Sequence, residues 1–298
     1  MWPDAAPIGL AVSGGPDSLA LLLLAHAALP EGRFAVATVD HGLRPEGAGE
    51  AALVAAICAA RGIAHTTLNL ALAPGSAVQE RARHARYRAL GDWCGANGLA
   101  ALVTAHHADD QAETLVMRLN RSAGLRGLAG MRAIAKVPGV ELPLVRPLLA
   151  WRHDALVAVV ANAGIAAVDD PSNRDVRFER ARVRAHLAEA PWLDRQRLAV
   201  SAAHLAQADD ALAWAAAAVT ITTDSDALIF DPDLPRALAL RVLERVVAGL
   251  GSSVPRGQDL AHWHDLLAAG DVATLAGVRG DGRAKPWRFV AAPPHKSA

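Results

Sequence analysis

The stretch Ser13-Gly14-Gly15-Pro16-Asp17-Ser18 follows the apolar run Ile8–Val12 and precedes a helical pattern that reaches about Ala28. Glycines let backbone amides approach an anion closely, and the first turn of a helix adds a favourable dipole. The stretch therefore predicts a phosphate-binding loop between a strand and a helix. It lacks the lysine and the spacing of a Walker A loop. The alternative is an ordinary strand-to-helix turn in which a serine or an aspartate caps the helix.

Asp17 is unusual in such a loop, because its carboxylate repels phosphate unless a cation lies between them. Mg²⁺ held by a carboxylate and by phosphate oxygens is a common arrangement. We therefore expect Asp17 to bind Mg²⁺, and we expect the hydroxyl groups of Ser13 and Ser18 to donate to phosphate oxygens.

Short apolar runs alternate with helical stretches through the first half of the chain. We expect strands at 8–12, 34–39, 63–70 and 100–104, with helices that end near 28, 61, 97 and 120. This alternation predicts an α/β fold built on a doubly wound parallel sheet, and the apolar strands fit a sheet that is covered on both faces. Ligands of such sheets lie at the carboxyl ends of the strands. The chain places residues 13–18, Asp40 and residues 106–110 there.

The pattern changes after Asn120. Glycines punctuate residues 124–131, which we expect to form a flexible loop, and residues 132–149 resemble a hairpin or two irregular strands. Helices are expected at 151–162 and 178–190. From about residue 198 the chain is alanine-rich and helical, with short β-segments near 227–230, 272–276 and 287–291. We therefore expect a first domain at 1–195 and a smaller, mostly helical domain at 196–298.

The formal net charge of the 298 residues is zero, which excludes a uniformly basic nucleic-acid binder. The charge is nevertheless uneven, because residues 118–197 carry 14 basic and 8 acidic side chains. A clustered basic segment is typical of a protein that binds a polyanion. The alternative is a solvated surface of salt bridges.

The two cysteines, Cys58 and Cys94, lie in expected helices and are spaced too far apart for a paired metal or redox motif. The N-terminus lacks the basic region of a signal peptide, and the apolar run 19–29 is about half the length that spans a bilayer. We expect a soluble, cytoplasmic protein without a membrane partner.

Residues 13–18 resemble the SGGxDS loop of the PP-loop ATP pyrophosphatases, which split ATP between its α and β phosphates. Further segments resemble the tRNA(Ile)-lysidine synthase family in the same order. They are residues 39–44, Gln79-Glu80-Arg81-Ala82-Arg83, residues 105–114 (AHHADDQAET), residues 125–131, residues 146–149 and residues 169–173.

This resemblance covers about residues 8–190 and implies an enzyme that uses ATP to join the ε-amine of free lysine to C2 of cytidine 34 in tRNA(Ile). ATP would bind at Ser13, Gly14, Gly15, Pro16, Asp17 and Ser18, and the first domain would be catalytic. The second domain would contact tRNA. Adenylation of the C2 oxygen turns a poor leaving group into AMP.

Lysine must lose a proton before it attacks, because its pKa is about 10.4. We expect Asp40, His106 or Asp110 to accept this proton, and we favour the two carboxylates because both lie at strand ends near the loop. By composition alone, the histidines and carboxylates of residues 106–113 could also form a metal site or a helix cap.

Arginines would hold the tRNA backbone. The candidates are Arg81, Arg121, Arg126, Arg177, Arg180 and Arg184, of which the last three form a stripe on one helical face. The family pattern has an asparagine where this chain has Ala181. A solvated helical face is the alternative for each group of arginines.

Three rival functions use the same loop. A tRNA thiolase would need reactive cysteines, which this chain does not place near the strand ends. A small-molecule ligase has no need of the basic segment, and a non-enzymatic nucleotide-binding module has no use for the AHHADDQAET motif.

Overall fold

The computed structural model describes residues 6–42, 46–70, 78–168, 175 and 177–292. The chain divides into two compact units, one of residues 1–123 and 127–204 and the other of residues 124–126 and 205–298. The boundary drawn from the sequence, 195/196, falls at the start of helix α8 (Arg195–Ala218), and the division lies within that helix.

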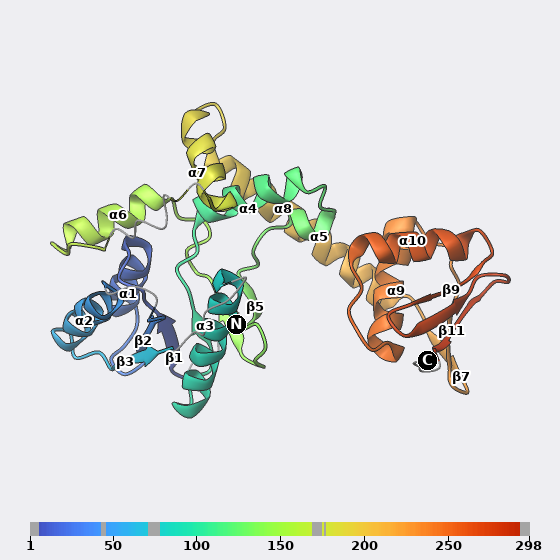
Figure 1. The fold of residues 1–298 in the computed structure, drawn as a ribbon, viewed down its shortest axis with the longest axis horizontal. Helices are drawn as coiled ribbons and strands as arrows, with labels where there is room; N and C mark the ends of the chain where they lie inside the picture. Colours follow the sequence, from blue (N-terminus) through green and yellow to red (C-terminus); the bar gives the residue numbers. More distant parts are fainter. Residues whose placement is uncertain (1–5, 43–45, 71–77, 169–174, 176, 293–298) are drawn as a thin grey trace. The chain divides into compact units, whose positions relative to one another are not determined.

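The first unit is built on a six-stranded sheet with the order β3-β2-β1-β4-β6-β5. Strands β1, β2 and β3 lie next to one another in Figure 1. Its strands are β1 (Ile8–Ala11), β2 (Phe34–Asp40), β3 (His65–Asn69), β4 (Leu102–Val103), β5 (Ile134–Lys136) and β6 (Pro143–Val145). All neighbouring strands pair in parallel except β5, which pairs antiparallel with β6. The expected α/β class with a parallel, doubly wound sheet is confirmed.

Apart from α5, which was not expected, the helices of this unit end close to the expected positions. They are α1 (Pro16–Ala28), α2 (Glu46–Ala59), α3 (Val78–Ala96), α4 (Ala108–Asn120), α5 (Leu125–Leu128), α6 (His153–Asn162) and α7 (Glu179–Glu189). Among the described residues, no helix is both long and apolar enough to cross a membrane.

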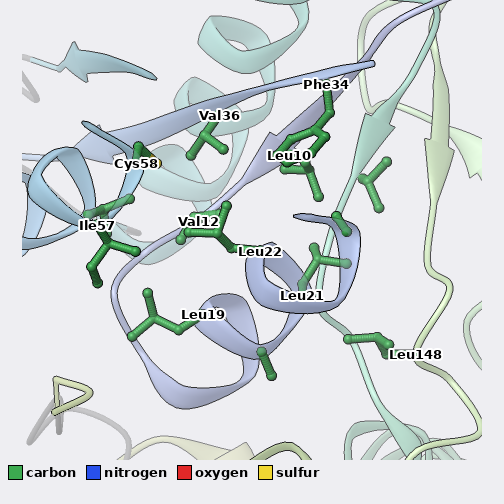
Figure 2. Packing of buried hydrophobic residues seen from close by; sticks show 14 of the residues in the cluster. Leu10, Val12, Leu19, Leu21, Leu22, Phe34, Val36, Ile57, Cys58 and Leu148 are labelled. Carbon is green, nitrogen blue, oxygen red and sulfur yellow. The ribbon is translucent and has the colours of Figure 1, made fainter. Parts of the chain in front are cut away.

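Alternation along β1 divides its side chains between two cores. Leu10 and Val12 pack with α1, α2 and α6, and Figure 2 shows Leu19 and Leu22 of α1 on the same side. Ala11 faces the opposite core, which Tyr87, Leu90 and Trp93 of α3 fill. Helices therefore cover the sheet on both faces, which explains why its central strands are apolar throughout.

The sheet order decides which loops can form a site. β1 pairs with β2 on one side and with β4 on the other, although β4 lies some ninety residues further along the chain. The chain segments that follow these three strands therefore leave the same edge of the sheet, at the point where the strand order reverses.

Residues 124–131 were expected to form a flexible loop, and this prediction was wrong for the four residues of α5. Arg118 donates hydrogen bonds to the carbonyl groups of Gly127 and Gly130, and the Gln111 side chain bonds both to and from the backbone of Met131. These two side chains fix the segment from α4, and no local glycine pattern reveals such contacts. The expected hairpin at 132–149 is β5–β6.

The second unit contains a five-stranded antiparallel sheet with the order β7-β8-β11-β10-β9. Its strands are β7 (Thr222–Asp224), β8 (Ala227–Phe230), β9 (Val272–Leu275), β10 (Val278–Asp281) and β11 (Trp287–Ala291), and its other helices are α9 (Arg236–Leu250) and α10 (Gly257–Ala268). The sheet adds to the mostly helical content that we expected. β7 and β10 were not expected from the sequence, because each is short and lacks an apolar run. Pairing with neighbouring strands holds both in the sheet.

Two tryptophans, Trp263 and Trp287, lie in the core of this unit and pack with Phe230 and Phe289, whereas Trp214 is 77% exposed on α8. Trp214 lies on the alanine-rich helix α8, whose sequence shows no clear apolar stripe. The sequence therefore does not predict which face of the helix is buried.

Gly9 in β1 lets α3 pack closely on the sheet. A Cβ atom at this position would lie 2.5 Å from Trp93 Cζ3 and 2.8 Å from Cys94 Sγ. We predict that Gly9→Ala lowers the free energy of unfolding by about 1–3 kcal/mol, because overpacking forces these side chains to shift. Urea denaturation measures the change.

The matched control is Gly95→Ala on α3, where a Cβ atom would meet nothing within 4 Å. This change should raise stability by about 0.5–1 kcal/mol, because alanine is the better helix former. Equal effects of the two alanines would contradict the packing account.

Candidate active site

The glycine loop closes on itself through Ser18. The Ser18 hydroxyl accepts a hydrogen bond from the Ser13 backbone N–H at 3.1 Å and donates one to the Gly15 carbonyl at 3.0 Å. Gly14 has a φ of +89°, which residues with a side chain rarely adopt. The serines thus shape the turn themselves, and a phosphate oxygen would have to replace the Gly15 carbonyl as the acceptor of the Ser18 hydroxyl proton.

The loop presents a helix start that no side chain caps. Gly15 is the N-cap of α1, Pro16 occupies the first turn, and no side-chain hydrogen bond caps this terminus. The free amides of the first turn are donors that an anion can satisfy. This geometry fits a phosphate better than the alternative of a self-capped turn.

Asp17 lies between two histidines from different parts of the chain. Its Oδ1 lies 2.8 Å from Nδ1 of His153, the first residue of α6, and its Oδ2 lies 3.4 Å from Nε2 of His107, the N-cap of α4. The two imidazole rings are 5.4 Å apart, centroid to centroid. The loops after β1 and β4 therefore meet, as the sheet order requires.

Asp17, His107 and His153 shift one another's pKa values. Burial by itself would raise the pKa of Asp17, but the contacts with His107 and His153 outweigh it and hold that pKa well below its usual range. Burial lowers the pKa of His107, and its contacts with Asp17, Asp110 and Asp109 outweigh this effect and raise it. The pKa of His153 is raised mainly by its hydrogen bond to Asp17. Asp17 is consequently ionised whenever the site works near neutral pH.

Asp110 and Asp109 support His107 from the first turn of α4. The Asp110 Oδ2 atom accepts a hydrogen bond from the His107 backbone N–H at 3.2 Å and lies 3.6 Å from His107 Nε2. Asp109 accepts hydrogen bonds from the His153 backbone N–H at 3.0 Å and from Arg195 at 3.2 Å. Asp110 therefore both caps the helix and lies within the same cluster as Asp17.

His106, which the sequence singled out, turns away from Asp17. Its Nδ1 atom lies 2.9 Å from the Thr104 hydroxyl. Burial lowers the pKa of His106 to about 3, although Asp110 opposes the shift. The ring is therefore neutral and weakly basic, and the neighbouring histidine takes the position beside the loop.

Glu113 links the cluster to the arginine-rich helix α7. Its buried carboxylate lies 2.6 Å from Nε of Arg184 and 3.2 Å from Nε of Arg180. Arg180 also donates to the Thr114 hydroxyl at 2.8 Å. Both arginines keep about two fifths of their side chains exposed, so they face solvent as well as Glu113.

Asp40 follows β2 and lies against the start of α2. Its Oδ1 atom accepts a hydrogen bond from the Gly42 backbone N–H at 2.9 Å, and a Cβ atom on Gly47 would lie 2.5 Å from the same oxygen. These contacts are those of a turn residue beside a helix start.

The remaining arginines of interest lie in several environments. Arg121 pairs with Glu179, Arg126 with Glu244, and Arg177 with Asp175, while Arg81 is exposed on α3. Arg44, the side chain of Gln79, and residues 169–173 of the family-like pattern lie outside the described residues.

His153 and Arg195 belong to the cluster but were not selected from the sequence. Neither stands in a recognisable motif, and each reaches the site from an element far along the chain. The fold brings His153 to Asp17 and Arg195 to Asp109, so the local sequence around each residue does not predict its place in the cluster.

Both cysteines are buried in the cores of the first unit. Burial raises the pKa of Cys58 to about 11 and that of Cys94 to about 12, so neither forms a thiolate near neutral pH. This chain therefore lacks the reactive cysteines that a thiolase chemistry would use.

Comparison with known proteins agrees with this geometry. A family model described as a PP-loop domain matches residues 3–190. A tRNA(Ile)-lysidine synthase of Novosphingobium aromaticivorans is 59% identical over 304 residues, which cover 99% of this chain and 93% of that protein. One of Zymomonas mobilis is 41% identical, over 99% of this chain and 92% of that protein.

Among solved structures, a U34-tRNA thiolase from Methanococcus maripaludis superposes with a TM-score of 0.55. It is 14% identical, and the match covers 68% of this chain and 72% of that one. At this identity the likeness shows the fold alone. The PP-loop domain, together with relatives that align with nearly the whole chain, shows that the chain belongs to the tRNA(Ile)-lysidine synthase family.

Proposed function

We propose that this chain is an ATP-dependent ligase that joins the ε-amine of lysine to C2 of cytidine 34 in tRNA(Ile). The reaction releases AMP and pyrophosphate and changes the codon that the anticodon reads from AUG to AUA. One observation carries the proposal: the SGGPDS loop and the AHHADDQAET motif meet at Asp17 and His107 in a chain of this family.

The glycine loop and the start of α1 would bind the ATP phosphates. The backbone amides and the helix dipole would stabilise the charge that moves onto pyrophosphate when the α–β bond breaks. The C2 oxygen of cytidine 34 attacks the α-phosphorus, which leaves an adenylated tRNA. The amine of lysine then attacks C2, and AMP departs with the former C2 oxygen.

Asp17 is the residue that would hold Mg²⁺. Its carboxylate is ionised and partly exposed, and its hard oxygen atoms are the donors that Mg²⁺ prefers. When bound, the ion would neutralise charge on the phosphates, and the two histidines would fix the carboxylate beside the loop.

Asp110 is the group that we favour as the acceptor of the proton from lysine. It lies in the cluster with His107 and Asp17, whereas the contacts of Asp40 hold it against α2. His106 is a weak base in its buried position. The structure thus supports one of the two carboxylates that the sequence analysis left open.

The anticodon stem and loop would contact the arginines of the basic segment, with Arg180 and Arg184 nearest to the catalytic cluster. Arg81, Arg121, Arg126 and Arg177 would contact the tRNA backbone, and the second unit would also contact tRNA. A cytoplasmic location, where tRNA, ATP and free lysine occur together, is part of the proposal.

Incorporation of labelled lysine into unmodified tRNA(Ile) tests the whole proposal. We expect incorporation that depends on ATP and tRNA, with stoichiometric release of pyrophosphate, and a loss of about 100-fold or more in Asp17→Asn. Asp92→Asn, an exposed change on α3, should retain the activity. Pyrophosphate release without lysine incorporation into tRNA would overturn the proposal.

Comparison of Asp110→Asn with Asp40→Asn tests the proton acceptor. We expect Asp110→Asn to slow lysine transfer about 100-fold at pH 7, since general bases contribute on this scale, while tRNA adenylation continues. Asparagine retains the oxygen that caps α4. The defect should shrink as the pH rises, because each unit frees about tenfold more lysine amine below its pKa.

Asp40→Asn is expected to transfer lysine at a nearly normal rate. A larger and pH-dependent defect in Asp40→Asn than in Asp110→Asn would assign the role to Asp40 instead. Equal defects in adenylation and transfer would remove Asp110 from this role.

The role of Arg180 and Arg184 in tRNA binding can be separated from their contacts with Glu113. We compare Glu113→Gln with the triple variant Glu113→Gln/Arg180→Ala/Arg184→Ala, so that neither protein contains an unpaired buried carboxylate. The triple variant should bind tRNA more weakly, with a salt dependence reduced by about one unit of slope per lost phosphate contact. Filter binding across a salt series measures the tRNA affinity and its salt dependence. Identical binding curves for the two variants would show that Arg180 and Arg184 pair with Glu113 but do not contact tRNA.

A further inference from the structure

Two tryptophans of the first unit leave large parts of their side chains open to solvent. Trp192 is 79% exposed and Trp151 is 40% exposed. Within the described residues, neither ring packs on another aromatic ring and neither indole N–H donates a hydrogen bond. By contrast, Trp263 in the second unit is 2% exposed and donates its N–H to the Ala273 carbonyl at 3.1 Å. Trp151 and Trp192 therefore lack the partners that a tryptophan of the core has.

Trp151 stands between β6 and α6, directly against the first turn of α4. Its carbonyl group accepts a hydrogen bond from the Ala108 backbone N–H at 2.8 Å. Two residues further along the chain, the His153 ring lies 2.8 Å from Asp17 of the glycine loop. The backbone of Trp151 is thus fixed beside the catalytic cluster, while its side chain stays partly exposed.

Trp192 lies in the link between α7 and α8, and hydrogen bonds hold the end of this link in the same place. Three residues further on, Arg195 donates to a carboxylate in the first turn of α4 at 3.2 Å. Gln196 donates to the Ala150 carbonyl at 3.0 Å, and Ala150 immediately precedes Trp151. The two tryptophans therefore stand on neighbouring segments that both border the start of α4.

Arginines accompany both tryptophans. Arg152 follows Trp151 directly, and Arg195 and Arg197 come three and five residues after Trp192; all three side chains are partly exposed. Two of them form exposed pairs with neighbouring aspartates, which are weak enough for a phosphate to replace. Aromatic rings among arginines are typical of proteins that bind single-stranded RNA, because bases stack on the rings and guanidinium groups bind the phosphates.

We propose that Trp151 and Trp192 hold, by stacking, an unpaired anticodon base next to cytidine 34. The inference rests on the proposed function, which makes tRNA(Ile) the substrate. Enzymes that act on a single base also contact the flanking nucleotides, and these contacts determine which sequence is accepted. A neighbouring base that stacks here would keep the anticodon loop open and cytidine 34 beside the glycine loop.

Binding of an anticodon stem-loop RNA from tRNA(Ile), followed by fluorescence anisotropy, tests the inference. Trp192→Ala should weaken this binding about 5- to 100-fold, since stacking on one aromatic ring contributes on this scale. Trp192→Phe should retain most of the affinity, because phenylalanine keeps an aromatic face. The KM for tRNA in lysine incorporation should rise in the same proportion. Because Trp192 is mostly exposed, its truncation costs little packing, and circular dichroism checks that the variants are folded.

The matched control is Trp214→Ala, which removes a tryptophan that is 77% exposed on α8 in the second unit. This variant should bind the stem-loop like the unmodified chain. An equal loss of affinity in Trp214→Ala and Trp192→Ala would overturn the assignment to the surface beside α4.

A series of stem-loops that each lack one base of the loop identifies the stacked base. Trp192→Ala should have no further effect on the RNA that lacks this base, and an equal effect on every RNA would overturn stacking on one base. Unchanged stem-loop affinity in Trp192→Ala, while the unmodified chain still incorporates lysine, would overturn this inference and leave the proposed function intact. Weaker ATP binding with unchanged RNA affinity would assign the surface to the adenine ring instead. Absence of lysine incorporation by the unmodified chain would overturn the proposed function and this inference with it.

Discussion

The pairing of β1 with β4 is the constraint on which the site depends. Gly9 and Leu10 of β1 lie in register with Leu102 and Val103 of β4, and this ladder places the loops after both strands at one edge of the sheet. The contact between Asp17 and His107 follows from that register, since each residue lies only a few positions beyond its strand. Gly9 allows α3 to cover the same strands from behind. Strand β1 therefore both supports the packing of α3 on the sheet and positions the loop that carries Asp17.

Much of this arrangement could be predicted from the sequence, because the relevant signals are local. Apolar runs predicted the four parallel strands of the first half within about two residues, and the glycine loop predicted the helix start that lacks a side-chain cap. Position within a parallel sheet then placed Asp17 and Asp110 together. By contrast, His153 and Arg195 have no local signal, and no local pattern predicts that β6 pairs with β4.

The choice between adjacent histidines also needed the structure. Both follow β4, and the sequence favoured His106, but the backbone turns that ring towards Thr104 and presents His107 to the loop. The structure also revised the interpretation of the basic segment, residues 118–197. Net charge along the chain suggested a surface for a polyanion, whereas Arg180, Arg184 and Arg195 each pair with a carboxylate of α4. Those pairs dock α7 and the start of α8 on α4 and leave part of each arginine side chain exposed to solvent.

The central claim is that the loops after β1 and β4 act as one catalytic unit. The most direct measurement is a double-mutant cycle of Asp17→Asn and His107→Asn, in which the rate of tRNA-dependent pyrophosphate release is followed. Residues that act as a unit give strongly non-additive losses. The account predicts that the double variant is scarcely slower than Asp17→Asn alone. Losses that multiply, so that their free energies add within about 0.5 kcal/mol, would contradict it.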